Sequence, residues 1–273
     1  MDKLNENWVG WRRDIHRHPE LGFGEARTSA VIAERLESFG IETHTGIGGT
    51  GVVGVLRRGS GARSVGLRAD IDALPIQEAN EFDHRSVNDG KFHGCGHDGH
   101  TAMLLAAAET LSAAESIDGT VNFIFQPNEE NGLGALAMMD DGLFERFEMD
   151  AVYGMHNMPG IPAGHFAVRK GPMMTFEDNF VISIRGLGGH ASMPNRTRDP
   201  VIVAAEIISA LQTIVARSLN PMDSGVVSVT EVHTDGARNV IPSNVTIKGD
   251  TRGLSDHVQA LIEKRMREIA VNI

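Results

Sequence analysis

The densest cluster of metal-binding residue types in this chain lies between residues 93 and 100. The run His93-Gly94-Cys95-Gly96-His97-Asp98-Gly99-His100 holds three histidines, an aspartate and the only cysteine of the 273 residues. Thiolate and imidazole are ligands that zinc and similar divalent metals prefer, and a carboxylate such as Asp98 can orient a ligating imidazole. Glycines let the backbone bend closely around an ion. The run therefore predicts a metal site more strongly than a polar loop with chance histidines.

Further candidate groups follow the ends of apolar segments. Glu129 and Glu130 follow residues 121–127, with Asn128 between, and His156 follows residues 150–155. Ligands of α/β proteins gather at the carboxyl ends of strands. Adjacent carboxylates point different ways, so one can bind metal while the other accepts a proton from water. On these residues alone, a solvated acidic turn and a structural histidine remain the alternatives.

Asp70 and Asp72 close a third apolar segment, residues 64–69, in the same way. Both carboxylates lie on one face of the predicted strand because side chains alternate along a strand. We expect them to support metal ligands and not to bind metal themselves.

Two glycine-rich segments need separate interpretations. Residues 46–51 match the pattern G-x-G-x-x-G, but residues 52–56 are typical of a strand. A dinucleotide site needs a helix at that point, so we predict a hairpin turn. The second glycine-rich segment is residues 186–189, and His190 follows it. This histidine either lies in an exposed tight turn or points out of its domain. The residues alone do not decide whether Asn239 has a function, because asparagine is common in turns.

The elements that would position these residues alternate over the first 170 residues. Helices are predicted over 8–18, 25–39, 101–113 and 133–140, and strands over 41–45, 51–56, 64–69, 121–126, 150–155 and 165–169. This alternation is the α/β pattern, and it predicts a central, mostly parallel sheet flanked by helices.

A different order of elements follows Gly171-Pro172. Strand, helix, strand, strand and helix are predicted over 179–184, 200–218, 225–232, 244–250 and 255–270. This is the split β-α-β, or ferredoxin-like, order short of its last strand. We therefore predict a metal-binding catalytic domain over 1–174 and an α+β domain over 175–273. The unfilled strand position indicates that the chain is a fragment.

Composition narrows the range of partners. The net charge is −11, from 25 basic and 36 acidic residues, which disfavours nucleic acid and anionic membranes. We find no apolar run that approaches the roughly 20 residues of a membrane span, and the N-terminus lacks the layout of a signal peptide. A single cysteine excludes an internal disulfide and fits a cytoplasmic location.

Taken together, several segments resemble the M20 metallopeptidase family, in particular its branch of hippurate hydrolases and N-acyl-amino-acid amidohydrolases. They occur in family order over nearly the whole chain, at residues 12–20, 68–75, 94–100, 126–130, 154–156, 188–191 and 239–242. The run Cys-Gly-His-Asp-Gly-His is specific to this branch.

The resemblance implies a two-metal site with four protein ligands, filled by manganese, zinc, nickel or cobalt. The ligands would be Cys95, His97, Glu130 and His156. The resemblance also implies that a metal-activated water, with Glu129 as general base, attacks the amide carbonyl of an N-acyl amino acid. The second domain would be an inserted lid through which a homodimer forms. His190 would stabilise the oxyanion and Asn239 would lie near the substrate.

The sequence departs from the family pattern at its end. The family carries a further metal-ligating histidine in a C-terminal segment, and this sequence stops before it. A chain that ends at Ile273 is therefore expected to bind metal weakly and to turn over little substrate. Two alternatives stay open, a thiol hydrolase with Cys95 as nucleophile and a non-catalytic metal-binding or dimerisation module.

Overall fold

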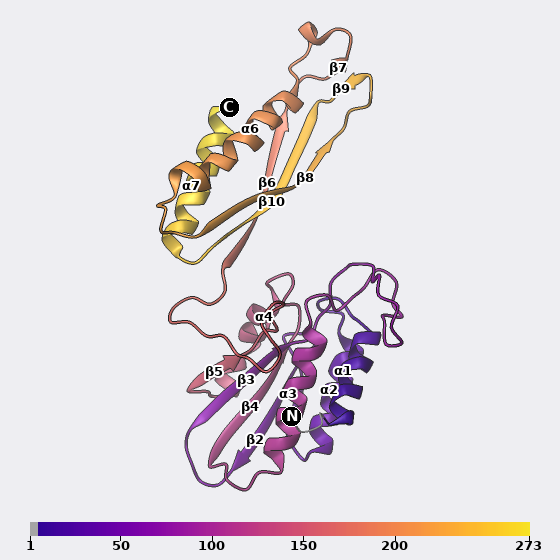
Figure 1. Ribbon diagram of the computed structural model, residues 1–273, viewed down its shortest axis with the longest axis vertical. Coiled ribbons are helices and arrows are strands. Elements are labelled where there is room, and N and C mark those ends of the chain that lie inside the picture. The colour runs from indigo at the N-terminus through magenta and orange to yellow at the C-terminus, as the bar shows by residue number, and fades with distance from the viewer. Residues whose placement is uncertain (1–4) are drawn as a thin grey trace. The chain divides into compact units, whose positions relative to one another are not determined.

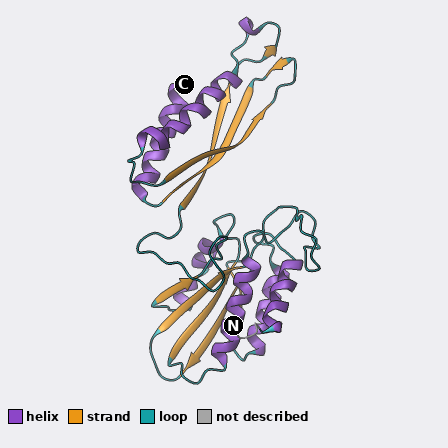
Figure 2. Ribbon diagram, in the orientation of Figure 1, coloured by secondary structure: helices purple, strands orange, loops and turns teal. Residues whose placement is uncertain are grey.

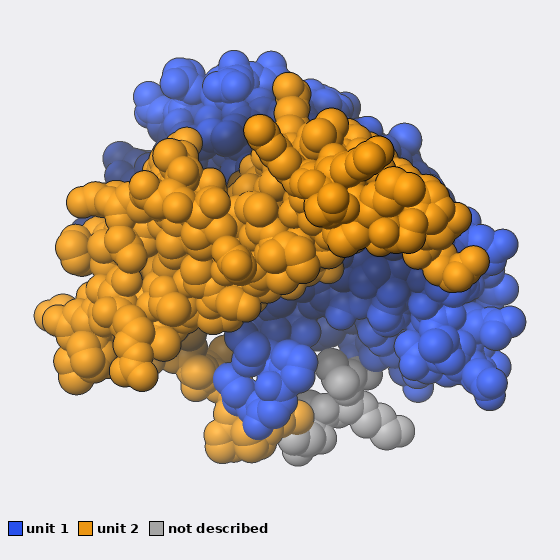
Figure 3. Space-filling model, turned by 90° about the horizontal axis from the view of Figure 1, so that it is seen from above, with its two compact units in different colours: residues 1–161 blue, residues 162–273 orange. Residues whose placement is uncertain are grey.

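The computed structural model describes residues 5–273, which form two compact units. The units divide between Ile161 and Pro162, ahead of the domain boundary predicted at residue 174 (Figure 3). Residues 155–175 form no helix or strand and are exposed. Exposed backbone without regular secondary structure is a common place for a domain boundary. Each unit has its own hydrophobic core.

A five-stranded sheet forms the centre of the first unit, in the order β1-β2-β4-β3-β5 (Figure 1). Its strands are β1 (Glu42–Ile47), β2 (Gly51–Arg58), β3 (Ser64–Asp70), β4 (Gly119–Gln126) and β5 (Ala151–Gly154). β3 pairs in parallel with β4 and β5, whereas β2 is antiparallel to β1 and β4. All strands except β2 thus run the same way, and the predicted mostly parallel sheet is confirmed.

Helices cover both faces of this sheet, and β4 is therefore buried on both sides. Phe123 and Phe125 point to one face, where they pack against α2 (Ala26–Ser38) and α3 (His97–Ser112), with α1 (Glu6–Arg17) alongside. Ile124 points to the other face and packs near α4 (Gly134–Asp140) and α5 (Leu143–Arg146). This alternation follows from the two-residue period of a strand.

The structure differs from the predicted elements in two places that matter. α3 begins at His97, four residues before its predicted start, because Gly96 adopts a left-handed conformation with φ of 94° and turns the chain into the helix. Residues 165–169 are not a strand. They pair with no described strand and leave Phe166 and Val168 more than four-fifths exposed. The predicted hairpin at residues 46–51 is confirmed, since β1 and β2 pair directly across it.

The second unit has the predicted order of strand, helix, strand, strand and helix. Figure 2 shows its helices beside its strands. Antiparallel strands β6 (Phe176–Arg185), β10 (Asn244–Gly253) and β8 (Gly225–Thr234) lie side by side in that order. Helices α6 (Pro200–Thr213) and α7 (Asp256–Asn272) pack on the sheet through a shared core. β7 (Gly189–His190) and β9 (Val240–Ile241) form a separate two-stranded ribbon. The role of this unit as a lid stays a prediction.

The helical stretch Pro200–Ser218 corrects one expectation. By length and composition alone it is apolar enough to cross a membrane, although no such run was expected. Its inward residues Ala204, Ile207, Leu211 and Ile214 are buried in the core of the second unit. The apolar character is therefore partly explained by packing within that unit.

Candidate metal centre

His97 lies in the first turn of α3 and is completely buried. Its Nδ1 lies 2.9 Å from the backbone oxygen of Asp72 and 3.2 Å from the Oδ1 atom of the same residue. Both atoms are acceptors, so Nδ1 carries a proton and donates it. The opposite ring atom, Nε2, is left to face the other candidate groups.

Three carboxylates surround Nε2 of His97. Oδ2 of Asp70 is 3.7 Å away, Oε1 of Glu130 is 3.8 Å away and Oε2 of Glu129 is 3.9 Å away. Within residues 5–273, neither His97 Nε2 nor Glu130 Oε1 has a hydrogen-bond partner, although both atoms are buried. Buried polar atoms without partners are costly. A divalent cation bound by both atoms would remove that cost, so these residues fit a metal ion.

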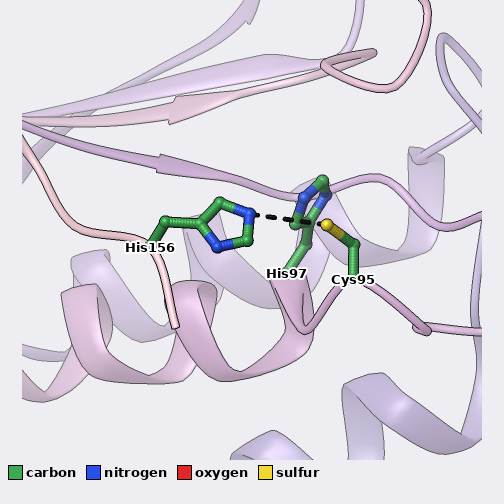
Figure 4. A group of neighbouring side chains, drawn as sticks. All are labelled: Cys95, His97 and His156. Atoms are coloured by element: carbon green, nitrogen blue, oxygen red, sulfur yellow. Dashed lines mark hydrogen bonds between the residues drawn. The ribbon is translucent and has the colours of Figure 1, made fainter. Parts of the chain in front are cut away.

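Cys95 and His156 also lie beside His97 (Figure 4). The Cys95 Sγ atom lies 3.4 Å from Nε2 of His156, whose Nδ1–H donates to the backbone oxygen of Asn157 at 2.7 Å. Potential ligand atoms of Cys95, His97 and His156 lie within 4.8 Å of one another, and so do those of His97, Glu129 and Glu130. The structure thus gathers the other three predicted ligands and the predicted base around His97.

The supporting role expected of Asp72 agrees with its contacts. While Oδ1 accepts from His97, Oδ2 accepts the backbone N–H of Glu130 at 3.0 Å. One carboxylate from the end of β3 therefore orients two candidate ligands that come from different elements. Such orienting contacts commonly raise the affinity of metal sites.

Asp70 supports the site through His100. Nδ1 of His100 donates to Oδ1 of Asp70 at 2.6 Å, and Nε2 of His100 lies 3.0 Å from the backbone nitrogen of Asn157, which follows His156. Asp70, His97 and His100 also lie close enough together to hold an ion. Asp70 and His100 are already hydrogen-bonded to each other, however. This agrees with a role in orienting the metal ligands and not with binding the metal directly.

The electrostatics of this cluster favour a cation. Burial alone would raise the pKa of Asp70, but the hydrogen bond from His100 and the charges of His97 and Arg68 lower it to about 2. Burial opposes a charge on His97, yet its contacts with Asp72, Cys95 and Asp70 raise its pKa to about 11. Burial raises the pKa of Glu130. The negative potential that keeps a proton on His97 is the potential that a metal ion would neutralise.

Asp98 and His93 belong to the same run of residues but lie apart from this centre. Asp98 contacts the Arg12 Nε atom at 2.6 Å and His16 Nδ1 at 2.8 Å. It does not orient the imidazole of His97, because consecutive residues of a helix point about 100° apart. His93 is buried, its ring nitrogens have no hydrogen-bond partner among residues 5–273, and burial lowers its pKa to about 4. It is a neutral core residue.

The two residues predicted near the substrate lie together in the second unit. His190 pairs with Val240 in the β7–β9 ribbon, and the backbone oxygen of Asn239 accepts the N–H of Ala191 at 3.0 Å. Both side chains are exposed, and Nδ1 of His190 lies 2.7 Å from the hydroxyl of Ser192. Both residues belong to the second unit, whereas the groups around His97 belong to the first.

Glu25 and Asn128 are two residues of the site region that the sequence did not single out. Asn128 directly precedes Glu129 and has a positive φ of 45°. Its backbone N–H donates to Oε1 of Glu25, which is fully buried, at 2.9 Å. Asparagine is common in turns and tolerates the left-handed conformation, so its residue type is a weak signal for Asn128. An acidic residue just before a helix is common, so nothing in the sequence marks Glu25.

The sequence model of the peptidase family M20/M25/M40 matches residues 66–264. This chain belongs to that family. It is 44% identical over 262 residues to the hippurate hydrolase of Campylobacter jejuni, an alignment that covers 96% of this chain and 68% of that protein. It is 39% identical over 267 residues to an N-acetylcysteine deacetylase of Bacillus subtilis, with 97% of this chain and 70% of that protein covered.

A solved structure supports the same assignment. It is a dinuclear metal-binding peptidase of the M20 family from Bacillus subtilis, 35% identical, with a TM-score of 0.78. The match covers 97% of this chain and 68% of that one. The M20 chain described here is thus a hydrolase by family, and it spans about two thirds of the length of these relatives.

Proposed function

We propose that this M20 chain carries the metal centre of an amidohydrolase that releases amino acids from N-acyl amino acids of the hippurate or N-acetyl type. The observation that carries the proposal is the pair of buried atoms without partners, His97 Nε2 and Glu130 Oε1, 3.8 Å apart. The substrate class is supported by the names of the relatives from Campylobacter jejuni and Bacillus subtilis.

The proposed ligands are Cys95, His97, Glu130 and His156. Divalent ions such as manganese, zinc, nickel or cobalt, two of them as in the dinuclear relative, would polarise the amide carbonyl and make water more acidic. Asp72 would orient the His97 ring and the Glu130 residue, because it accepts hydrogen bonds from His97 Nδ1 and from the Glu130 backbone N–H.

Glu129 is the proposed general base. Its side chain is 39% exposed, compared with 19% for Glu130, so it can meet a substrate while its neighbour binds metal. Glu129 takes a proton from the attacking water and passes it to the leaving nitrogen, which departs as an amine. We further propose that His190 stabilises the oxyanion, that Asn239 contacts substrate, and that the second unit serves as a lid in a homodimer. A cytoplasmic location would keep Cys95 reduced.

The test is amine release from a panel of N-acetyl, N-benzoyl and longer N-acyl amino acids. The full gene product is stripped with a chelator and then reloaded with Mn²⁺ or Zn²⁺. We expect turnover that disappears on stripping and returns with metal. Metal binding without turnover of any substrate in the panel would refute the proposed activity.

A thiol hydrolase is a second candidate because of one contact. Cys95 lies 3.4 Å from His156, whose other ring nitrogen is held by the Asn157 carbonyl, and a cysteine nucleophile needs such a paired histidine. A thiol mechanism does not explain why His97 Nε2 and Glu130 Oε1 are buried without hydrogen-bond partners among residues 5–273. A thiol hydrolase would resist chelators and lose activity with iodoacetamide, whereas the metal enzyme would lose activity on chelation and recover with metal.

A further inference from the structure

We propose that Glu25 is a positioning residue that fixes the turn from which Glu129 and Glu130 reach the metal centre. The consequence for catalysis rests on the proposed function, whereas the consequence for metal binding and for the turn does not. Glu25 precedes α2 and is 103 residues away from Asn128 in the sequence. It contacts the turn and not the candidate ligands.

The turn itself has an uncommon backbone conformation. Asn128 has a φ of 45°, in the left-handed region, which asparagine enters more readily than other non-glycine residues but less readily than glycine. Asn128 is 2% exposed, its backbone oxygen accepts the N–H of Gly134 at 3.1 Å, and its side-chain oxygen accepts from the Asn131 amide at 2.5 Å. This reversal after β4 places the two glutamates beside His97. Strained residues persist where the surroundings hold them.

Glu25 supplies the contact that holds the turn from outside. Its Oε1 atom accepts the Asn128 N–H at 2.9 Å, and its Oε2 atom accepts the Thr50 hydroxyl at 2.6 Å. Thr50 lies in the glycine-rich hairpin between β1 and β2, and its backbone oxygen accepts the hydroxyl of Ser29 in α2. One buried carboxyl group thus joins the start of α2, the hairpin and the end of β4.

Two glycines, Gly22 and Gly134, pack so closely against the turn that little room is left for another backbone conformation. A Cβ atom on Gly22 would lie 1.9 Å from the Asn128 side-chain oxygen, and one on Gly134 would lie 1.6 Å from the Pro127 carbonyl. Asn128 is buried, so its N–H needs an acceptor, since a buried donor without one is destabilising. Without Glu25 we expect the turn to relax and to displace the glutamates.

The test compares Glu25→Ala and Glu25→Gln with the control Glu20→Ala. Glu20 accepts the backbone N–H groups of Arg27 and Thr28 in the same helix, but it does not contact the turn. Metal affinity is measured by competition with a chelator, and hydrogen exchange is followed over residues 127–134. We expect Glu25→Ala to lower metal affinity about 10- to 100-fold and to speed exchange in that segment. Glu25→Gln should retain most of the affinity, since its carbonyl can accept from Asn128 and its amide can donate to Thr50.

In the loaded enzyme, kcat should fall for Glu25→Ala while KM changes little, because the displaced groups act on the reaction and not on substrate binding. Adding Asn128→Gly to Glu25→Ala should restore part of the metal affinity, since glycine adopts a positive φ without strain. If Glu25→Ala does not fold, Thr50→Val removes one of the two contacts and should give a smaller loss in the same direction.

Two results would overturn the inference. One is wild-type metal affinity and exchange in Glu25→Ala or, if that variant does not fold, in Thr50→Val. The other is an equal loss of metal affinity in Glu20→Ala, which would indicate a general effect of weakening α2. If the wild type hydrolyses no N-acyl amino acid, the proposed function fails, but the affinity and exchange measurements still decide the role of Glu25.

Discussion

The protonation state of His97 links metal uptake to pH. The pKa of this residue is raised to about 11 in the metal-free protein, because the acceptors and acidic groups around it outweigh the effect of burial. The ring is thus doubly protonated at neutral pH, and Nε2 must lose its proton before it can bind a metal ion.

We therefore predict that metal binding releases protons and strengthens as the pH rises from 6 to 8. Isothermal titration calorimetry in buffers of different ionisation enthalpy would count the protons at each pH. We expect about one proton from His97 for the ion it binds, with any proton of the Cys95 thiol in addition. A binding enthalpy that is the same in all buffers would contradict this.

The two adjacent glutamates should respond differently to the same substitution. Glu129→Gln removes the proposed base and should lower kcat about 10²- to 10⁴-fold while metal content stays the same. Glu130→Gln should lose metal, because its buried Oε1 atom is a proposed ligand. Metal content after dialysis and amine release are measured on both variants. Undiminished turnover by Glu129→Gln would contradict the assignment.

His16 predicts a pH dependence of stability outside the metal centre. Burial lowers the pKa of this residue, but hydrogen bonds to Asp98 and Glu78 outweigh that effect, and its pKa is raised above 6.5. The stability from this pairing is fully present below about pH 6.5 and is lost as the pH rises through the raised value. Urea unfolding in chelator between pH 6 and 9 should show a smaller alkaline loss for His16→Gln than for the wild type. Parallel curves would exclude this contribution.

At the level of elements, the first turn of α3 depends on the glycine before it. Gly96 has a φ of 94°, and a Cβ atom there would lie 2.4 Å from the Asn157 side-chain oxygen. Gly99, in the same turn, has open space around its Cβ position. The two glycines form a natural pair for comparison.

Gly96→Ala should lower the free energy of unfolding by about 1–3 kcal/mol and weaken metal binding, since His97 and Cys95 flank this position. Gly99→Ala should be neutral or stabilising by up to about 1 kcal/mol. Thermal or urea unfolding and chelator competition would measure both effects. Equal behaviour of the two variants would show that the backbone of Gly96 is not critical.

The same elements show how far the sequence leads. Apolar periodicity predicted the alternation of strands and helices, and a strand after the G-x-G-x-x-G segment predicted the hairpin. The early start of α3 was not predicted, because apolar periodicity does not report the left-handed conformation of Gly96 that begins the helix. Residues 165–169 alternate like a strand, yet strand formation needs a neighbouring strand, which periodicity does not report.

The candidate site shows a similar limit. Residue type and position at strand ends identified the groups now found around His97. Their orientation comes from contacts between distant segments, such as Asp72 with the Glu130 backbone and Glu25 with Asn128. Such pairings depend on the folded sheet, and a single sequence without its contacts cannot reveal them.

At the scale of the whole molecule, the exposed segment between the units is the expected point of attack for a protease. Arg169 and Lys170 lie in it, and the segment has no regular secondary structure. Limited digestion with trypsin should therefore cleave first at these residues and leave two resistant fragments. Mass spectrometry of early products would identify the sites. First cleavage within either sheet would contradict the division into two compact units.

The groups around His97 lie between residues 70 and 157, all within the unit that ends at Ile161. A ribosome synthesises that unit before most of the strands and helices that follow, and domains generally fold as units in that order. The cluster can therefore assemble, and can meet cellular metal ions, while the rest of the chain is still being translated. Metal supply during synthesis would then influence how much of the newly made protein reaches the loaded state.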